Sequence, residues 1–211
     1  MSKTGIFVLN SRYDILQKII RKYDDAILEE KIMQINLNEF QTYHKSNLPG
    51  LYALFIKNED CLSKIFTPAF CKKILNHMKQ NNCKNCIYIG KETNKLYERI
   101  EKKHINGDIR HSTLRYTISY CANMDRYKVK GISISKKRKI KKSDEKRITK
   151  WINENCDFKI IETNDYNSLE KQFINKFCLP LNITNNPKPI IARGERTQGF
   201  IDLDKDDFDN I

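Results

Sequence analysis

The sequence lacks any apolar stretch as long as the ~18 residues that a membrane-spanning helix requires. Its first residues also lack the basic segment followed by an apolar core that marks a secretion signal. No internal repeat occurs along the 211 residues, so a repeat architecture is not indicated. These absences predict a soluble, cytoplasmic protein that does not associate with a membrane.

A disulfide framework is not indicated either, because the seven cysteines are odd in number and scattered through predicted strands and helices. In a reducing cytosol most of them are expected to be small buried apolar residues. Cys83 and Cys86 have the spacing of half a zinc site, which Cys61 and Cys71 would complete. A single pair with this spacing is weak evidence for a zinc site, and Cys86 begins a predicted core strand. We therefore favour a packing role for these cysteines.

Positive charge is abundant. The chain has 39 Lys and Arg against 26 Asp and Glu, a formal net charge of +13. This balance favours a polyanionic partner, with nucleic acid first and an anionic membrane surface second. The densest basic run is Lys136–Lys142, which contains Lys137 and Arg138. We expect these two residues to contact a DNA backbone, although such a run also fits a solvated loop.

The organisation along the chain suggests one main domain with additions at both ends. Residues 1–47 are predicted to form a packed helical extension, with a helix from about Tyr13 to Met33. Residues 48–190 form the main domain, and an insertion at 57–85 carries a helix of its own. Residues 191–211 are rich in aspartate and are expected to be a solvated acidic tail.

Three apolar segments predict strands. Gly50–Ile56 and Cys86–Gly90 are rich in β-branched and aromatic residues, and Phe158–Ile161 follows much later. Helices are predicted over Lys91–Lys103, over Thr113–Cys121 with Ser112 as its cap, from about Ser143, and over Leu169–Phe177 with Ser168 as its cap. The expected fold class is α+β, with a small, three-stranded, largely antiparallel sheet flanked by helices.

The most informative pattern joins Gly50-Leu-Tyr52 and Tyr88-Ile-Gly90, on two neighbouring predicted strands, with Arg99 on the helix that follows. Glu170 comes later on an amphipathic helix, and Asn182 follows it. One carboxylate can hold a hard divalent cation, and an arginine can donate two hydrogen bonds to a phosphate. Each of these residues alone has an ordinary structural explanation, so the hypothesis depends on their occurring together in this order.

In that order the residues resemble the GIY-YIG nuclease family, over about residues 48–186. The segments His111-Ser-Thr-Leu-Arg115 and Leu179-Pro-Leu-Asn182 resemble one subgroup of it. The resemblance implies a GIY-YIG-like fold and one active site made of Tyr52, Tyr88, Arg99, Glu170 and Asn182. It also implies that Glu170 binds Mg²⁺ (or Mn²⁺), and that Lys91 and Arg115 lie near the substrate.

A further polar group follows the arginine in some family members. Here Lys103 lies four residues after Arg99, as regular helical spacing requires, and His104 lies one residue further on. Because histidine suits proton transfer near neutral pH, we expect His104 at the site, which requires the helix to tighten or bulge near Lys103.

The predicted function is a divalent-metal-dependent endonuclease that hydrolyses phosphodiester bonds, with DNA as the expected substrate. Either Tyr52 or Tyr88 would position or deprotonate the attacking water, and the sequence leaves this choice open. Two alternatives also stay open. One is a catalytically inactive nucleic-acid-binding module on the same fold, and the other is a structural protein whose basic surface meets RNA or an acidic partner.

Overall fold

The structure is a computed structural model that describes residues 36–133, 137–192 and 194–211. The chain divides into two compact units, Met1–Asn36 and Leu37–Ile211, and the description below concerns the second. The helix expected within the N-terminal extension, from about Tyr13 to Met33, lies outside the described residues.

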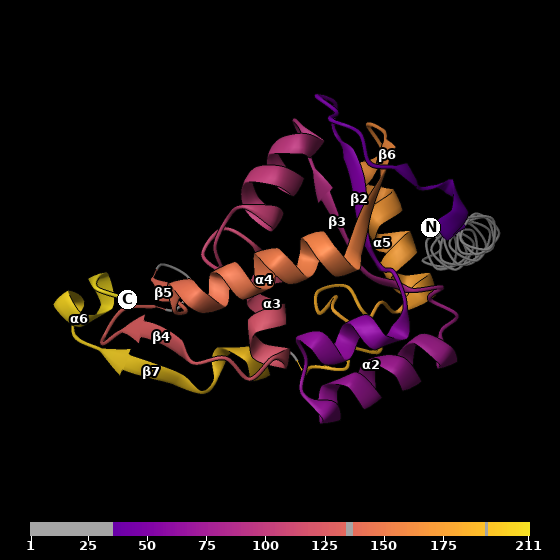
Figure 1. Ribbon diagram of the computed structural model, residues 1–211. Coiled ribbons are helices and arrows are strands. Elements are labelled where there is room, and N and C mark those ends of the chain that lie inside the picture. Colours follow the sequence, from indigo (N-terminus) through magenta and orange to yellow (C-terminus); the bar gives the residue numbers. More distant parts are fainter. Residues whose placement is uncertain (1–35, 134–136, 193) are drawn as a thin grey trace, which may run out of the picture. The chain divides into compact units, whose positions relative to one another are not determined.

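The main sheet confirms the predicted α+β class. It contains β1 (Gln41–Thr42), β2 (Gly50–Ile56), β3 (Cys86–Glu92) and β6 (Cys156–Glu162), in the order β1-β6-β2-β3 (Figure 1). All neighbouring pairs are antiparallel. The three long strands correspond to the three predicted ones, and β1 adds a two-residue edge. Strand β2 lies between two partners and is buried along its whole length.

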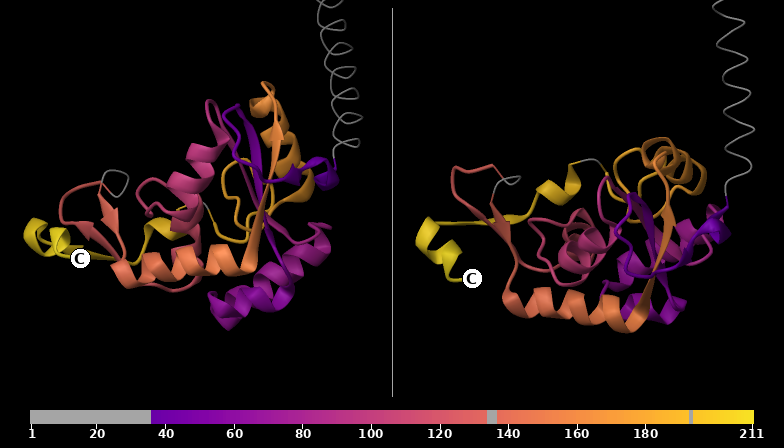
Figure 2. Two further views of the ribbon diagram at one scale, coloured as in Figure 1. Left: turned by 45° about the horizontal axis from the view of Figure 1, so that its top comes forward. Right: turned by 90° about the horizontal axis from the view of Figure 1, so that it is seen from above.

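Each face of the sheet is covered by a different helix (Figure 2). The η3 helix (Glu98–Ile105) covers one face, where the rings of Tyr52 and His104 lie 5.0 Å apart. Helix α5 (Tyr166–Phe177) packs on β2 and β3 from the other side, where Phe40 bridges Phe55 and Phe173 with ring distances of 6.4 and 5.1 Å. Alternate residues of β2 therefore face two different environments, and Tyr52 belongs to the η3 side.

The remaining helices follow the sequence patterns with small shifts. Helix α2 (Pro68–Gln80) lies in the predicted insertion, after the short η2 helix (Glu59–Lys64). Helix α3 (Thr113–Cys121) is confirmed with its cap, since Ser112 Oγ accepts the Arg115 backbone N–H at 3.0 Å. Helix α4 (Lys142–Asn155) has Lys141 at its N-cap. Helix α5 begins at Tyr166, so Ser168 lies inside the helix and is not its cap.

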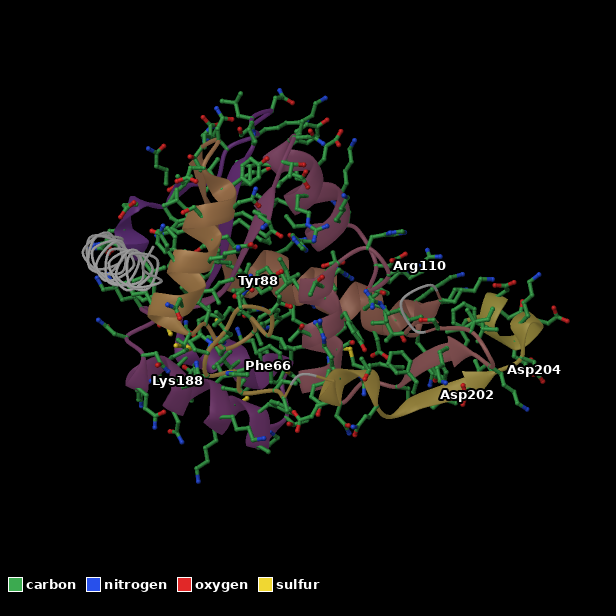
Figure 3. All side chains as sticks on the ribbon, turned by 180° about the vertical axis from the view of Figure 1, so that it is seen from behind. Phe66, Tyr88, Arg110, Lys188, Asp202 and Asp204 are labelled. Atoms are coloured by element: carbon green, nitrogen blue, oxygen red, sulfur yellow. The ribbon has the colours of Figure 1, made fainter. Side chains whose placement is uncertain are left out.

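A second, smaller sheet corrects the expectation of a solvated acidic tail. Strands β4 (Arg126–Val129), β5 (Arg138–Lys139) and β7 (Phe200–Leu203) form it in the order β5-β4-β7. Helix α6 (Lys205–Asp209) then places Phe208 against β4, where it is 3% exposed. The aspartates of this segment stay at the surface, while the apolar residues between them supply enough buried area to fold it. Asp202 and Asp204 lie well away from Tyr88 (Figure 3).

The cysteines are packing residues in this structure. Six of the seven are buried, Cys71 is half-buried, and all are free thiols. Among the described residues, no group of three or more His, Cys, Asp or Glu is placed to hold a metal ion, so the zinc interpretation gains no support. Within the same part of the chain, no helix has the length and apolar character needed to cross a membrane.

Candidate active site

The residues of the motif pattern converge on one pocket, of about 350 Å³, at the β3 edge of the main sheet. Its lining includes six of the expected site residues, namely Tyr52, Tyr88, Lys91, Arg99, Glu170 and Asn182. They come from β2, β3, η3, α5 and the loop after α5, so residues that are more than one hundred positions apart meet in one place.

The hydroxyl of Tyr52 is the centre of the hydrogen-bond network. Arg99 Nε donates to it at 3.3 Å, and His104 Nε2 lies 2.8 Å from it. Gly90 is directly opposite Tyr52 in the β2–β3 register, and a side chain at Gly90 would collide with the tyrosine ring and hydroxyl. The second glycine of the motif is therefore required by the close approach of the Tyr52 side chain to the neighbouring strand.

His104 reaches Tyr52 because η3 is a π-helix. The Asn106 N–H donates to the Glu101 carbonyl, five residues earlier, at 2.9 Å. This wider turn places residues five apart on the same face, so Arg99 and His104 both point at Tyr52. The structure thus brings His104 to the tyrosine by the helix bulge that the sequence spacing requires.

Ser112 fixes the orientation of the His104 ring. Its Oγ lies 2.7 Å from His104 Nδ1 and accepts the Arg115 backbone N–H. We assign the Ser112 hydroxyl proton to His104 Nδ1, which lies within hydrogen-bond distance. In the tautomer that this assignment gives, the imidazole proton is on Nε2 and faces Tyr52, whose oxygen then accepts from Arg99 and His104.

Burial and nearby positive charge set the protonation of this network. Burial lowers the pKa of His104 well below its usual value, and the charges of Arg99, Arg115 and Lys103 add to this effect. Burial raises the pKa of Tyr52, whereas the charge and hydrogen bond of Arg99 oppose that rise. Burial raises the pKa of Tyr88 well above its usual value, and the charge of Tyr52 raises it further. At neutral pH His104 is therefore neutral, and Arg99 acts most directly on Tyr52.

Glu170 supplies the carboxylate of the pocket and is the one acidic residue within α5. Its Oε2 lies 2.9 Å from Lys91 Nζ, and the Glu170 side chain is 14% exposed. A carboxylate that lines a pocket and keeps some access to solvent fits a Mg²⁺ or Mn²⁺ ion, because such cations often take one or two protein carboxylates together with waters and phosphate oxygens. The residues present therefore fit the cation that the resemblance implies.

Asn182 lines the pocket, but its amide group is occupied. Its Nδ2 donates to the Ile89 carbonyl at 2.8 Å, and its Oδ1 accepts the Ile89 N–H at 2.9 Å. The Leu181 N–H also donates to the Ile87 carbonyl at 2.9 Å. These hydrogen bonds fasten the loop after α5 to the outer side of β3, so the geometry gives Asn182 a positioning role.

Arg115 has a different place from the expected one near the substrate. Its side chain is fully buried and pairs with Glu145, with Nη2 and Nε at 2.6 and 3.0 Å from Oε2. Its Nη1 donates to the carbonyls of His104 and Ile105 at 3.0 and 2.9 Å. Because all of its nitrogens are engaged inside the protein, Arg115 supports the end of the π-helix and does not face the pocket.

The described part of the basic run, residues 137–142, also lies outside this pocket. Arg138 belongs to β5, and its guanidinium packs 4.2 Å from the centre of the Tyr116 ring. Lys137 precedes it and is half-buried. Arg196, which the sequence pattern did not single out, lines the pocket instead. No motif spacing points to Arg196, because the segment that carries it is positioned by the second sheet.

Residues 50–196, more than half of the chain, match a family model that is described as the GIY-YIG catalytic domain. The chain belongs to the GIY-YIG family. The matched residues include both motif strands, η3, α5 and the whole pocket, so the GIY-YIG assignment and the pocket geometry concern the same part of the molecule. A GIY-YIG catalytic domain is a nuclease-type domain. No curated protein and no solved structure matches this chain significantly.

Proposed function

We propose that this GIY-YIG domain is a divalent-metal-dependent endonuclease that cleaves phosphodiester bonds in DNA. The observation that carries the proposal is the convergence of Arg99 and His104 on the Tyr52 hydroxyl, in the same pocket as Glu170. Hydrolysis of a phosphodiester needs a group that takes a proton from water and positive charge around the phosphate. Both requirements have residues available in this pocket.

Tyr52 is the proposed proton acceptor. Two N–H donors on one phenolic oxygen favour its ionised form, and Arg99 adds a positive charge next to it. Tyr88 receives less of this help, since its pKa is also raised by the charge of Tyr52. In the proposed step the ionised Tyr52 oxygen accepts a proton from the attacking water. Tyr88, on the same face of the sheet, orients that water.

Arg99 and Lys91 are the proposed phosphate ligands. Hydrogen bonds from Nε to Tyr52 and from Nη1 to the His111 carbonyl, each at 3.3 Å, hold the Arg99 guanidinium at the pocket. A held guanidinium loses little freedom when it binds a phosphate and suits the planar geometry of two oxygens. Lys91 contributes a compact positive charge that is 32% exposed and able to bind an anion.

Glu170 would hold the divalent cation, Mg²⁺ or Mn²⁺. The chemistry that such a cation supplies when bound is stabilisation of the negative charge on the phosphate and on the departing 3′ oxygen. Lys91 pairs with Glu170 in the present structure, so the carboxylate is oriented before any cation arrives.

The net charge of +13 supports a polyanionic substrate. DNA is the substrate that we propose, and RNA is the alternative that the assay below separates from it. We place the activity in the cytoplasm. An inactive nucleic-acid-binding module on the same fold is the competing hypothesis.

A plasmid-nicking assay tests the proposal. Purified protein is incubated with supercoiled DNA in magnesium, in manganese and with a chelator, and a single-stranded RNA of matched concentration is run beside it. We expect nicked and linear DNA with either metal and none with the chelator. Binding of DNA without cleavage under every metal condition would favour the inactive module, and preferred cleavage of RNA would correct the substrate.

A further inference from the structure

A second basic hollow adjoins the catalytic pocket, and Arg196 lines both. Arg196 lies in the short η4 helix (Glu195–Thr197), just before β7. The second hollow has a volume of about 530 Å³, and Tyr116, Lys128 and Arg138 are also part of its lining. A ligand that leaves the pocket past Arg196 therefore enters a surface made by α3 and the second sheet.

Two arginines in this hollow are held in fixed orientations by one aromatic ring. The guanidinium groups of Arg138 and Arg196 lie 4.2 and 4.9 Å from the centre of the Tyr116 ring. Arg196 Nη1 donates to Thr117 Oγ1 at 2.9 Å, and Arg138 Nε donates to the Ile109 carbonyl at 2.9 Å. Stacking and neutral hydrogen-bond acceptors orient each group without cancelling its charge.

Within the described part of the chain, no direct ion pair compensates the charges of this cluster, and Asp108 acts on Arg138 from beyond ion-pair distance. There, neither Arg138 nor Arg196 forms an ion pair with a carboxylate, whereas Arg110 and Arg115 pair with Asp108 and Glu145. Burial lowers the pKa of Arg138, and the charge of Arg196 is among the further causes. Two like charges that stack on one ring repel each other, and an anion that contacts both groups would offset that repulsion.

A third arginine fixes the segment that carries Arg196. Arg126 Nη1 donates to the Arg196 carbonyl at 2.6 Å, and its Nη2 donates to the Gln198 carbonyl at 2.8 Å. The Tyr116 hydroxyl also donates to the Arg196 carbonyl. The backbone next to Arg196 is thus anchored at two points, which leaves its side chain oriented between the two hollows.

We propose that Arg196 and Arg138, stacked on Tyr116, form a subsite for a backbone phosphate of the strand that occupies the catalytic pocket, outside the scissile bond. This inference rests on one part of the proposed function, namely that a nucleic-acid strand enters the catalytic pocket. The competing explanation is that the arginine stack serves only to pack the second sheet against α3.

The test measures binding separately from cleavage. A Glu170→Gln background is titrated with a fluorescein-labelled DNA duplex without divalent metal, and anisotropy is recorded over a series of salt concentrations. Arg196→Gln and Arg138→Gln are each expected to reduce the log–log salt slope by about 0.9 for each phosphate that the variant no longer neutralises. Lys150→Gln is the control, because Lys150 is exposed and already pairs with Glu154 on its own helix. It should leave the slope unchanged.

Arg196→Lys, which keeps the charge, should retain most of the slope that Arg196→Gln loses. Unchanged slopes in both glutamine variants, with lower melting temperatures, would overturn the proposal and show a packing role. A protein that nicks plasmids but shows unchanged slopes would also refute the subsite while leaving the nuclease in place. A protein that never cleaves but shows reduced slopes would refute the nuclease and support the subsite.

Discussion

Two cation–carboxylate pairs in this molecule contain similar groups and differ in nearly everything else. Lys91–Glu170 joins the pocket side of β3 to α5 through a single N–O approach of 2.9 Å, with side chains 32% and 14% exposed. Arg115–Glu145 joins α3 to α4 through both Nη2 and Nε, and the Arg115 side chain is fully buried. The second pair also engages backbone carbonyls of η3, whereas the Lys91 ammonium makes one ion pair and lines a pocket.

The difference shows how accessibility separates a binding pair from a structural one. The Lys91 ammonium can leave Glu170 for an incoming anion, because water can replace it on both partners. The Arg115 guanidinium cannot leave Glu145 without leaving its own fully buried charge and two helix-end carbonyls without partners. The sequence places both pairs beside motif residues, yet only the first pair is available to a ligand.

Removal of Arg115 should have the largest effect on stability. Arg115→Met should lower the free energy of unfolding by about 3 to 5 kcal/mol, since Glu145 and the carbonyls of His104 and Ile105 lose a fully buried charged partner. Chemical denaturation measures this loss. The matched control is Arg110→Met, whose ion pair with Asp108 is largely exposed and should contribute at most about 1 kcal/mol. Equal losses in the two variants would contradict the structural role of Arg115.

Disruption of the Lys91–Glu170 pair should lower activity rather than stability. Glu170→Gln keeps the shape of the side chain and removes the charge that would hold a divalent cation, so metal-dependent cleavage should fall at least ~10²-fold. Its unfolding free energy should stay close to that of the unaltered protein, because Lys91 keeps access to water. Initial rates of plasmid nicking and a denaturation curve measure the two quantities. Undiminished cleavage would remove Glu170 from the metal site.

His104 depends on the Arg115–Glu145 pair, because Arg115 supports the helix end that positions the histidine. His104→Ala removes an N–H donor from the Tyr52 oxygen, so we expect about a tenfold lower rate, the effect of one missing hydrogen bond to a developing charge. The pH profile of cleavage should also move to higher pH, since Tyr52 becomes harder to ionise. Lys103→Ala is the control and should cut normally. The opposite ranking of the two variants would assign the role to Lys103.

The same histidine should make the fold sensitive to acid. Its pKa is lowered in the folded protein by burial and nearby cations, from an ordinary value of 6.5. Below about pH 6.5 the unfolded chain therefore binds a proton that the folded protein does not, and stability falls by at most about 1.4 kcal/mol per pH unit. Above that pH the effect vanishes. Denaturation curves of the unaltered protein and of His104→Gln, taken between neutral and acidic pH, should diverge only on the acidic side.

The smallest expected effect concerns Lys91. Lys91→Met removes the ammonium group that competes with a cation for Glu170, so Mn²⁺ should bind more tightly, by at most about fivefold for an ion pair worth about 1 kcal/mol. Isothermal titration with Mn²⁺ in the absence of DNA measures the change. Lys150→Met should show none. Weaker Mn²⁺ binding by Lys91→Met would mean that the ammonium helps to build the cation site.

The parts that local sequence predicts are those governed by short-range patterns. Alternation in β2 and β3 puts Tyr52 and Tyr88 on one face, and the Ser112 cap begins α3 where expected. From the sequence, the π-helix could be inferred only as the condition under which His104 reaches the site. Its extra residue is stabilised by Arg115 and Thr149, which come from distant helices. The parallel pair of β4 and β7 was missed, since it joins four-residue strands more than 70 residues apart, which are too short to give a clear strand pattern and have no local signal that pairs them.

The hydrogen bonds between Asn182 and Ile89 have a consequence for the solubility of the protein. Strand β3 ends the main sheet, so without a cover it would present unpaired backbone groups to other copies of the chain. The Asn182 amide and the Leu181 N–H occupy those groups on Ile89 and Ile87, and thereby act as a substitute strand. One asparagine thus shapes the pocket and also closes an aggregation-prone edge. Its loss would favour self-association by strand pairing even where the catalytic residues stay in place.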